Sequence, residues 1–170
     1  MTLTPTSYIV LGLIERAGSA TPYELKALVA ASVGNLWSIP HSQLYAEPQR
    51  LAHAGCLTEE RERGGRRRRT YALTDAGRAA LQAWRAEPTD VLPELRDLAL
   101  LKIFFGADPT PIAARQLAAH EAKLAEYRAL HAELVGDASV GGPALTLEAG
   151  IAHEREWVSY WNRLTKRAST

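Results

Sequence analysis

The sequence predicts a mainly α-helical protein with one small β-hairpin: a winged helix-turn-helix domain followed by a helical domain built on an antiparallel helix hairpin. Two observations predict this fold. The first half of the chain combines short helical apolar patterns with an arginine-rich hairpin, and the second half carries two long amphipathic patterns. We expect the first domain over residues 1–86 and the second over residues 87–170.

Two helices are expected at the start of the chain. Apolar residues over 8–14 keep one helical face, and Gly18 ends that helix. Thr21 and Glu24 have the spacing of a capping box, with proline between them at the first helical position. This pattern predicts a second helix that runs to about Ser32.

The third helix is expected from near Ser42 to Ala54, after a turn over residues 34–40. Gly55 follows it in the position that favours a left-handed stop. We expect Trp37, within the turn, to fill the core. Pro48 removes an amide donor inside the third helix, which predicts a kink near this residue or an irregular first turn.

A hairpin and a fourth helix complete the first domain. Residues 57–62 and 66–73 read as strands around a glycine pair that suits a tight turn. Thr74 caps the next helix, and Asp75 lies in its first turn, where the helix dipole favours a carboxylate. The tip of the hairpin carries four consecutive arginines: Arg66, Arg67, Arg68 and Arg69.

The second domain is expected to be entirely helical. Helices are predicted over residues 95–105, 112–135 and 145–164, with a flexible turn over 136–143. The two long helices would expose a wide apolar stripe unless something covers it. We expect a second copy of the chain to cover it, which gives a homodimer through the carboxy-terminal helices.

Charge is distributed unevenly along the chain, although the net charge is only +1. Residues 1–86 hold 11 Lys and Arg against 7 Asp and Glu, a net of +4. Residues 87–170 hold 9 against 12, a net of −3. This asymmetry indicates that only the first half meets a polyanion such as double-stranded DNA, and the alternative is scattered surface charge.

A groove-reading helix needs polar side chains near its amino-terminal end. The third helix has them, and the alternative is an ordinary solvated helix face. A histidine just before this helix could touch a phosphate. The candidate DNA-contacting residues here are His41, Ser42, Gln43, Tyr45, Gln49 and Arg50.

The arginines at the hairpin tip divide between two faces, because side chains alternate along a strand. Arg67 and Arg69 share the face of the apolar Tyr71, while Arg66 and Arg68 share the other face. Only some of the four can reach one groove, where they would meet phosphates or enter the minor groove. The alternative is a solvated, charged loop.

Aromatic residues concentrate in the second half of the chain. Packing in the core or in a dimer is the favoured interpretation, and the alternative is a pocket for a small apolar or aromatic effector. We expect such an effector near the junction of the two halves. The candidate effector residues are Phe104, Phe105, Trp157 and Trp161.

No pattern in the sequence indicates a cofactor, a metal ion or catalysis. His120 and His131 share a helix face but lie about 16 Å apart along its axis, too far to hold one ion. The one cysteine, Cys56, excludes an intrachain disulfide and is typical of a reducing compartment. No apolar run approaches the roughly 20 residues of a membrane helix, so we expect a cytoplasmic protein with no membrane partner.

The stretch SIPHSQLYAEPQRLAHAGCLTEERERGGRRRRTYALTDAGRAALQAWRAEP resembles the DNA-binding domain of PadR-type transcriptional regulators. The resemblance extends back to YIVLGLIERAGSATPYELKAL and forward to ELRDLALLKIFFG, and it covers roughly the first 106 residues closely. The long helical region is similar to the larger of the family's two main subgroups.

This resemblance implies a homodimer with interlocking carboxy-terminal helices and a repressor role that a small molecule lifts. By the family pattern, Tyr45 corresponds to a tyrosine that meets the DNA backbone, and the arginines fall on the wing. Many members have proline directly after that tyrosine and leucine two positions further on. This chain has Ala46 and Pro48 there.

We therefore expect a sequence-specific, ligand-responsive repressor that binds a palindromic operator as a homodimer. Three rivals stay open at this point: a winged-helix adaptor that binds protein, an enzyme that uses the aromatic cleft, and an RNA-binding winged helix. Salt-insensitive binding would favour the adaptor, and turnover by the purified protein would favour the enzyme. Competition between duplex DNA and RNA would separate the RNA-binding winged helix from a DNA-binding one.

Overall fold

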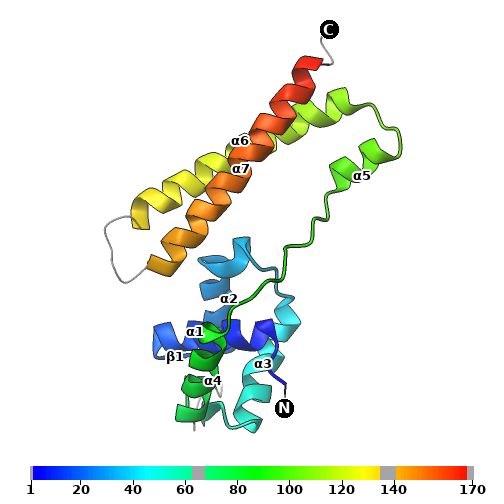
Figure 1. Cartoon of the computed structure of the whole chain (residues 1–170). Helices are drawn as coiled ribbons and strands as arrows, with labels where there is room; N and C mark the ends of the chain where they lie inside the picture. The colour runs from blue at the N-terminus through cyan, green and yellow to red at the C-terminus, as the bar shows by residue number, and fades with distance from the viewer. Residues whose placement is uncertain (1, 63–67, 135–140, 168–170) are drawn as a thin grey trace. The chain divides into compact units, whose positions relative to one another are not determined.

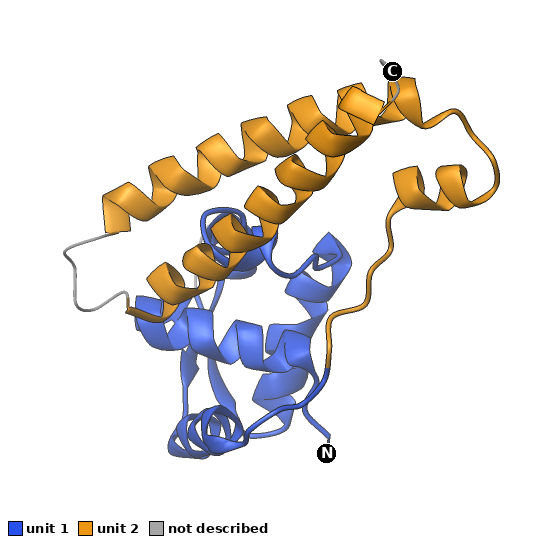
Figure 2. Ribbon diagram, turned by 45° about the horizontal axis from the view of Figure 1, so that its top comes forward, with its two compact units in different colours: residues 1–91 blue, residues 92–170 orange. Residues whose placement is uncertain are grey.

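The computed structural model describes residues 2–62, 68–134 and 141–167 (Figure 1). It has two compact units, Met1–Val91 and Leu92–Thr170, which Figure 2 colours separately. The predicted fold class is confirmed, because the chain is mostly helical and has one small antiparallel sheet. The sequence placed the boundary between domains after residue 86.

Within its described residues, the amino-terminal unit packs four α-helices against a three-stranded sheet with the strand order β1-β3-β2. The hairpin predicted from sequence forms β2 and β3, and β1 is an additional strand, too short to show any alternation. The helices are α1 (Pro5–Ala17), α2 (Pro22–Ala30), the 3-10 helix η1 (Val33–Asn35), α3 (His41–His53) and α4 (Asp75–Ala86). The strands are β1 (Ser19–Ala20), β2 (Leu57–Arg61) and β3 (Arg69–Leu73).

Local signals at the helix ends behave as the sequence predicts. The Thr21 hydroxyl accepts a hydrogen bond from the Glu24 backbone, and the Glu24 carboxylate accepts one from the Thr21 amide at 2.8 Å. Gly18 and Gly55 have φ values of 77° and 76°, in the left-handed region that glycine tolerates. Thr74 caps α4 by accepting a hydrogen bond from the Gly77 amide at 3.0 Å. These caps fix where the helices begin and end.

One expectation for the α2–α3 region is wrong, and a second stays a prediction. Pro48 lies inside α3, which runs as one helix from His41 to His53, and the expected kink near it stays a prediction. The proline ring is fully buried. Trp37 does not fill the core, since 46% of its surface is exposed.

One hydrophobic core holds the amino-terminal unit together. It draws on all four helices and on the core-facing side of the sheet, where Tyr71 and Leu73 of β3 are buried as alternation predicts. The deepest aliphatic side chains come from α1, α2, α3 and α4: Val10, Leu11, Ile14, Leu25, Leu44, Leu51 and Leu81. The other face of α3 therefore stays at the surface.

The carboxy-terminal unit consists of α5 (Leu98–Phe104), α6 (Pro109–Leu134) and α7 (Gly141–Arg167). Figures 1 and 2 show α6 and α7 side by side and antiparallel. Helix α5 is shorter than predicted, and α7 begins inside the predicted turn, of which residues 136–140 lie outside the described residues. No helix in the described ranges is both long and apolar enough to cross a lipid bilayer.

Candidate nucleic-acid interface

Helix α3 presents a polar face to solvent. Its inner side is anchored by Leu44 and Leu51, which are buried, and its outer side begins at the first helical residue. The side chain of Tyr45 is 50% exposed, and Gln49 is half-buried one turn later. The exposed polar residues of the first turns are His41, Ser42, Gln43 and Tyr45. This face has the polar character that base and phosphate contacts need.

The guanidinium of Arg50 is engaged within the protein by two partners. Nε donates to the Glu47 carboxylate at 2.8 Å, and Nη2 donates to the hydroxyl of Ser7 at 2.7 Å. Ser7 belongs to α1 and is fully buried. The arginine therefore joins α3 to α1, whereas the exposed face of α3 is formed by other residues.

The β2–β3 hairpin forms the wing. Arg68, just before β3, and Arg69, at its start, are both exposed. The Arg69 side chain lies near the carboxylate of Glu59 on β2, with 3.9 Å between Nε and Oε1. The two other predicted wing arginines, Arg66 and Arg67, lie outside the described residues.

Glu59 organises the base of the wing. Arg61 donates a hydrogen bond to its carboxylate, and the hydroxyl of Tyr71 donates another at 3.0 Å. The hydrogen bond from Arg61 is the main reason why the pKa of Glu59 lies below its ordinary value, and the Tyr71 hydroxyl and the Arg69 charge lower it further. The wing therefore keeps an ionised carboxylate among its arginines.

The carboxy-terminal unit contains an aromatic cluster on α7. Trp161 is fully buried, and its ring stacks with Trp157 at a centroid distance of 6.0 Å. Trp157 also stacks with His120 of α6 at 5.6 Å and meets the edge of Tyr160 at 5.8 Å. Within the described part of the chain, the indole N–H of Trp161 has no hydrogen-bond acceptor.

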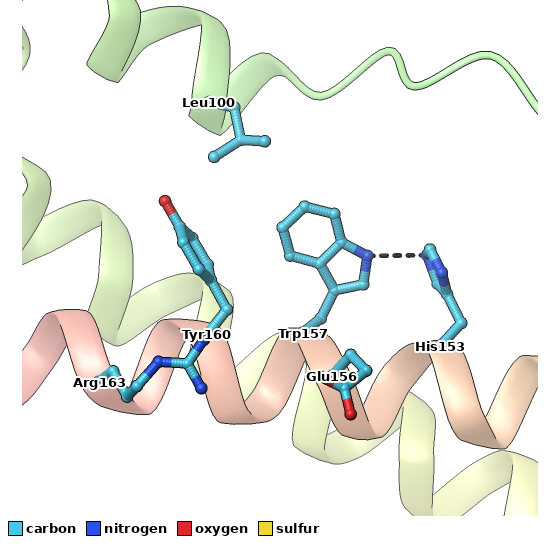
Figure 3. Close-up of a pocket in the computed structure, with 6 residues that line it drawn as sticks. All are labelled: Leu100, His153, Glu156, Trp157, Tyr160 and Arg163. Carbon is cyan, nitrogen blue, oxygen red and sulfur yellow. Dashed lines mark hydrogen bonds between the residues drawn. The ribbon is translucent and has the colours of Figure 1, made fainter.

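An open hollow of about 470 Å³ lies beside this cluster, between α7 and α5. Figure 3 shows the rings of Trp157 and Tyr160 rising from α7 toward Leu100. The Trp157 indole donates to Nε2 of His153 at 2.7 Å. The hollow is lined by Leu100, His153, Glu156, Trp157, Tyr160 and Arg163. Its walls are largely aromatic, and its rim carries the charged residues Glu156 and Arg163.

The four predicted effector residues do not come together. Trp157 lines the hollow and Trp161 lies in the core beneath it. Phe104 and Phe105 are 81% and 77% exposed, and they contact each other edge to face at the end of α5. The two phenylalanines are thus surface residues at the carboxy-terminal end of α5.

Histidine–carboxylate pairs link α6 to α7. His120 Nδ1 lies 2.5 Å from Glu154 Oε2, and His131 Nε2 lies 3.2 Å from Glu148 Oε1. Each contact joins one histidine to one carboxylate. Among the described residues, no group of three or more His, Cys, Asp or Glu side chains could hold a metal ion.

Two residues in these sites were missed from the sequence. Ser7 contacts Arg50, which lies 43 positions away, so no local pattern could mark it. Glu59 did carry a signal, because its partners Arg61 and Tyr71 lie in the predicted hairpin. The pairing of Glu47 with Arg50 also had a signal, since a spacing of three residues puts opposite charges side by side on a helix.

Comparisons with known proteins agree with this architecture. Residues 10–83 match the model of the Transcriptional regulator PadR-like family, and residues 95–167 match that of the Virulence activator alpha C-term. The negative transcriptional regulator PadR of Bacillus subtilis is 26% identical over 167 residues, which cover 90% of this chain and 91% of that protein.

Two solved structures of that relative have the same fold. The crystal structure of Bacillus subtilis PadR in complex with operator DNA superposes with a TM-score of 0.83 at 24% identity, and the match covers 98% of this chain and 99% of that chain. Its structure in complex with p-coumaric acid gives a TM-score of 0.78, also at 24% identity, and the match covers 99% of each chain.

A winged helix-turn-helix with a polar helix face and a basic wing, followed by a helical unit, defines a DNA-binding transcriptional regulator. Both units match models of such regulators in the expected order. The amino-terminal unit carries a domain of the PadR-like family of transcriptional regulators over residues 10–83, and the chain is similar to Bacillus subtilis PadR over most of its length.

Proposed function

We propose that this protein is a ligand-responsive repressor that binds a palindromic operator as a homodimer. The observation that carries the proposal is the exposed polar face of α3, in the same compact unit as a wing that bears arginines. Helix α3 would enter the major groove, and Arg68 of the wing would meet phosphates. Two-fold symmetry would place the half-sites about one helical turn, roughly 34–36 Å, apart.

Dimerisation would use the helices of the carboxy-terminal unit. Support comes from α5, whose large apolar side chains are exposed although a monomer gains nothing from exposing them. These side chains are Leu98, Leu101, Phe104 and Phe105. A second copy that covers them would bring two recognition helices onto one duplex.

The effector would be a small aromatic molecule that binds in the hollow on α7. Trp157 and Tyr160 offer ring faces for stacking, and Arg163 at the rim can meet an acidic substituent. Bacillus subtilis PadR was solved with p-coumaric acid, which has such a ring and such a group. Binding would lower operator affinity only if the ligand prefers the protein conformation that binds DNA poorly. No catalytic step belongs to this function.

A gel-shift titration tests the DNA arm of the proposal. The probe is a duplex from the region upstream of the protein's own gene, and the control is a duplex of the same composition with a scrambled sequence. We expect salt-sensitive binding that prefers the first duplex at submicromolar protein. The absence of salt-sensitive, sequence-preferring binding at submicromolar protein would overturn the proposal.

Tryptophan fluorescence tests the effector arm. We expect p-coumaric acid to quench the emission of the intact protein, since Trp157 lines the hollow, and to release the duplex in the gel shift. The control is Trp157→Phe, which keeps an aromatic ring but removes this fluorophore. Equal quenching in the two proteins would place the ligand elsewhere.

A further inference from the structure

The contacts of Arg50 suggest a role that differs from touching DNA. Its guanidinium bonds two groups at once, the Glu47 carboxylate one turn earlier on α3 and the Ser7 hydroxyl on α1. Of the two charged side chains, only 11% of Glu47 is exposed, compared with 36% of Arg50. The planar fork of arginine allows this two-point contact, which a lysine ammonium cannot reproduce.

The same network reaches the start of α1. The Ser7 hydroxyl accepts a hydrogen bond from the Thr4 amide at 2.8 Å, as one half of the capping box that begins α1. The capping box therefore fixes the position of Ser7 independently of its contact with Arg50. The Glu47 carboxylate, in turn, is held ionised, because the hydrogen bonds from Arg50 lower its pKa.

Helix α3 depends on such contacts because its own beginning is weakly fixed. Pro40 precedes the helix and provides no side-chain cap. Near this end, the Thr6 hydroxyl donates a 3.3 Å hydrogen bond to the Gln43 side chain, which is a second link from α1. Two contacts with α1, from Thr6 to Gln43 and from Arg50 to Ser7, thus fix the orientation of the outer face of α3.

We propose that Arg50 is a positioning residue for DNA reading, which holds the exposed face of α3 in register through Glu47 and Ser7. The inference rests on the proposed function, because it assumes that this face meets base edges. Base contacts need side chains placed within about 0.5 Å, whereas phosphate contacts tolerate small shifts. Loss of the network therefore lowers specific affinity more than non-specific affinity.

The test measures two quantities for the full-length protein. One is the ratio of affinities for the upstream duplex and its scrambled control, and the other is the slope of log affinity against log salt. Arg50→Lys keeps the charge but loses the fork, so we expect the ratio to fall about tenfold, as for one charge-assisted hydrogen bond, with an unchanged slope. Glu47→Gln should lower the ratio in the same way, although it removes a negative charge.

Arg85→Lys is the matched control. Arg85 of α4 pairs with Glu15 of α1 at 2.6 Å, so the same substitution keeps the charge and removes a guanidinium hydrogen bond in the same unit without touching α3. We expect its affinity ratio to equal that of the unmodified protein. Circular dichroism and thermal melting identify variants that fail to fold, and Glu47→Gln then carries the test if Arg50→Lys is one of them.

Two results would overturn the positioning role. One is an unchanged affinity ratio in the folded variants. The other is a salt slope that falls by about 0.9 in Arg50→Gln, which would identify a direct phosphate contact. Failure of the unmodified protein to prefer the upstream duplex is a different result, since it overturns the proposed function and removes the basis of this inference with it.

Discussion

Glu59 on β2 lies directly opposite Tyr71 on β3, and the tyrosine hydroxyl donates a 3.0 Å hydrogen bond to the glutamate carboxylate. The ring of Tyr71 is buried in the core, while the carboxylate also bonds Arg61 at the surface. This pair therefore connects the core of the amino-terminal unit to the charged base of the wing.

Tyr71→Phe should destabilise the protein by about 1 kcal/mol, the typical net value of one hydrogen bond. The phenylalanine ring fills the same space, so the core stays packed, and Glu59 keeps its contact with Arg61. Urea denaturation at neutral pH measures the difference. An unchanged free energy of unfolding would mean that the hydroxyl bond adds nothing to the arginine contact.

Stability should fall in acid because of Glu59. Its folded-state pKa lies below the ordinary 4.5, first because of the hydrogen bond from Arg61 and then because of Tyr71 and Arg69. A depressed pKa contributes stability above the unfolded-state value, and this contribution is lost as the pH falls through the folded-state value. Glu59→Gln should therefore lower the free energy of unfolding at neutral pH and flatten its decline below about pH 4.5. An acid decline equal to that of the unmodified protein would contradict this assignment.

The sequence was sufficient for the parts of the fold that local chemistry decides. The capping box of Thr21 and Glu24 and the left-handed glycine Gly55 depend on residues a few positions apart, and each is where the sequence predicts it. The pairing of β1 with β3 and the contact of Ser7 with Arg50 join residues far apart in the chain. Such pairings follow from tertiary packing, and the spacing of apolar residues along the sequence does not reveal them.

Gly77 should tolerate no side chain. A Cβ built there would lie 2.1 Å from the Cys56 carbonyl oxygen and 2.9 Å from Cδ2 of Leu73. Both are parts of the core that cannot move easily, so Gly77→Ala should destabilise the protein by about 1–3 kcal/mol or more. Urea or thermal denaturation measures this change.

Gly12 provides the matched control for that substitution. It also lies inside a helix, but the nearest atom to an added Cβ is 4.0 Å away, at the end of the flexible Arg85 side chain. Gly12→Ala should leave the fold intact and stabilise it by roughly 0.5–1 kcal/mol, because alanine favours helix. Equal losses in the two variants would show that the close approach at Gly77 is not the cause.

Tyr45→Ala should weaken DNA binding without lowering the melting temperature. The side chain is half exposed, so we expect its removal to change mainly the surface of α3. We expect operator affinity to fall about tenfold, which a loss of roughly 1.4 kcal/mol produces. A loss of affinity accompanied by a large drop in melting temperature would assign the residue to stability instead.

Arg68→Ala should lower the salt slope of DNA binding by about 0.9, the expected effect of one lost phosphate contact. Arg128→Ala is the charge control, since Arg128 is exposed on α6 in the carboxy-terminal unit. It removes the same charge outside the wing and should leave the slope unchanged. Identical slopes in both variants and the unmodified protein would remove Arg68 from the interface, and Arg66/Arg68→Ala would then test the tip as a whole.

Replacing the exposed phenylalanines of α5 should shift the protein from dimer to monomer. Phe104→Glu/Phe105→Glu introduces two charges on the surface that a second copy would cover, and burying unpaired charge is costly. Light scattering coupled to size exclusion measures the mass. The comparison variant is Leu145→Glu, which changes an exposed apolar residue of α7. If the phenylalanine double variant remains a dimer, the dimer interface does not include these two residues.

The network of Ser7, Glu47 and Arg50 also constrains how this chain can change over evolutionary time. Loss of Arg50 alone leaves a nearly buried carboxylate without its cation, and loss of Glu47 alone leaves the arginine beside only a hydroxyl. Each single step is unfavourable, whereas a joint replacement by apolar residues restores a compatible set. Positions 7, 47 and 50 should therefore covary among relatives, while the outer face of α3 diverges as each regulator acquires its own operator.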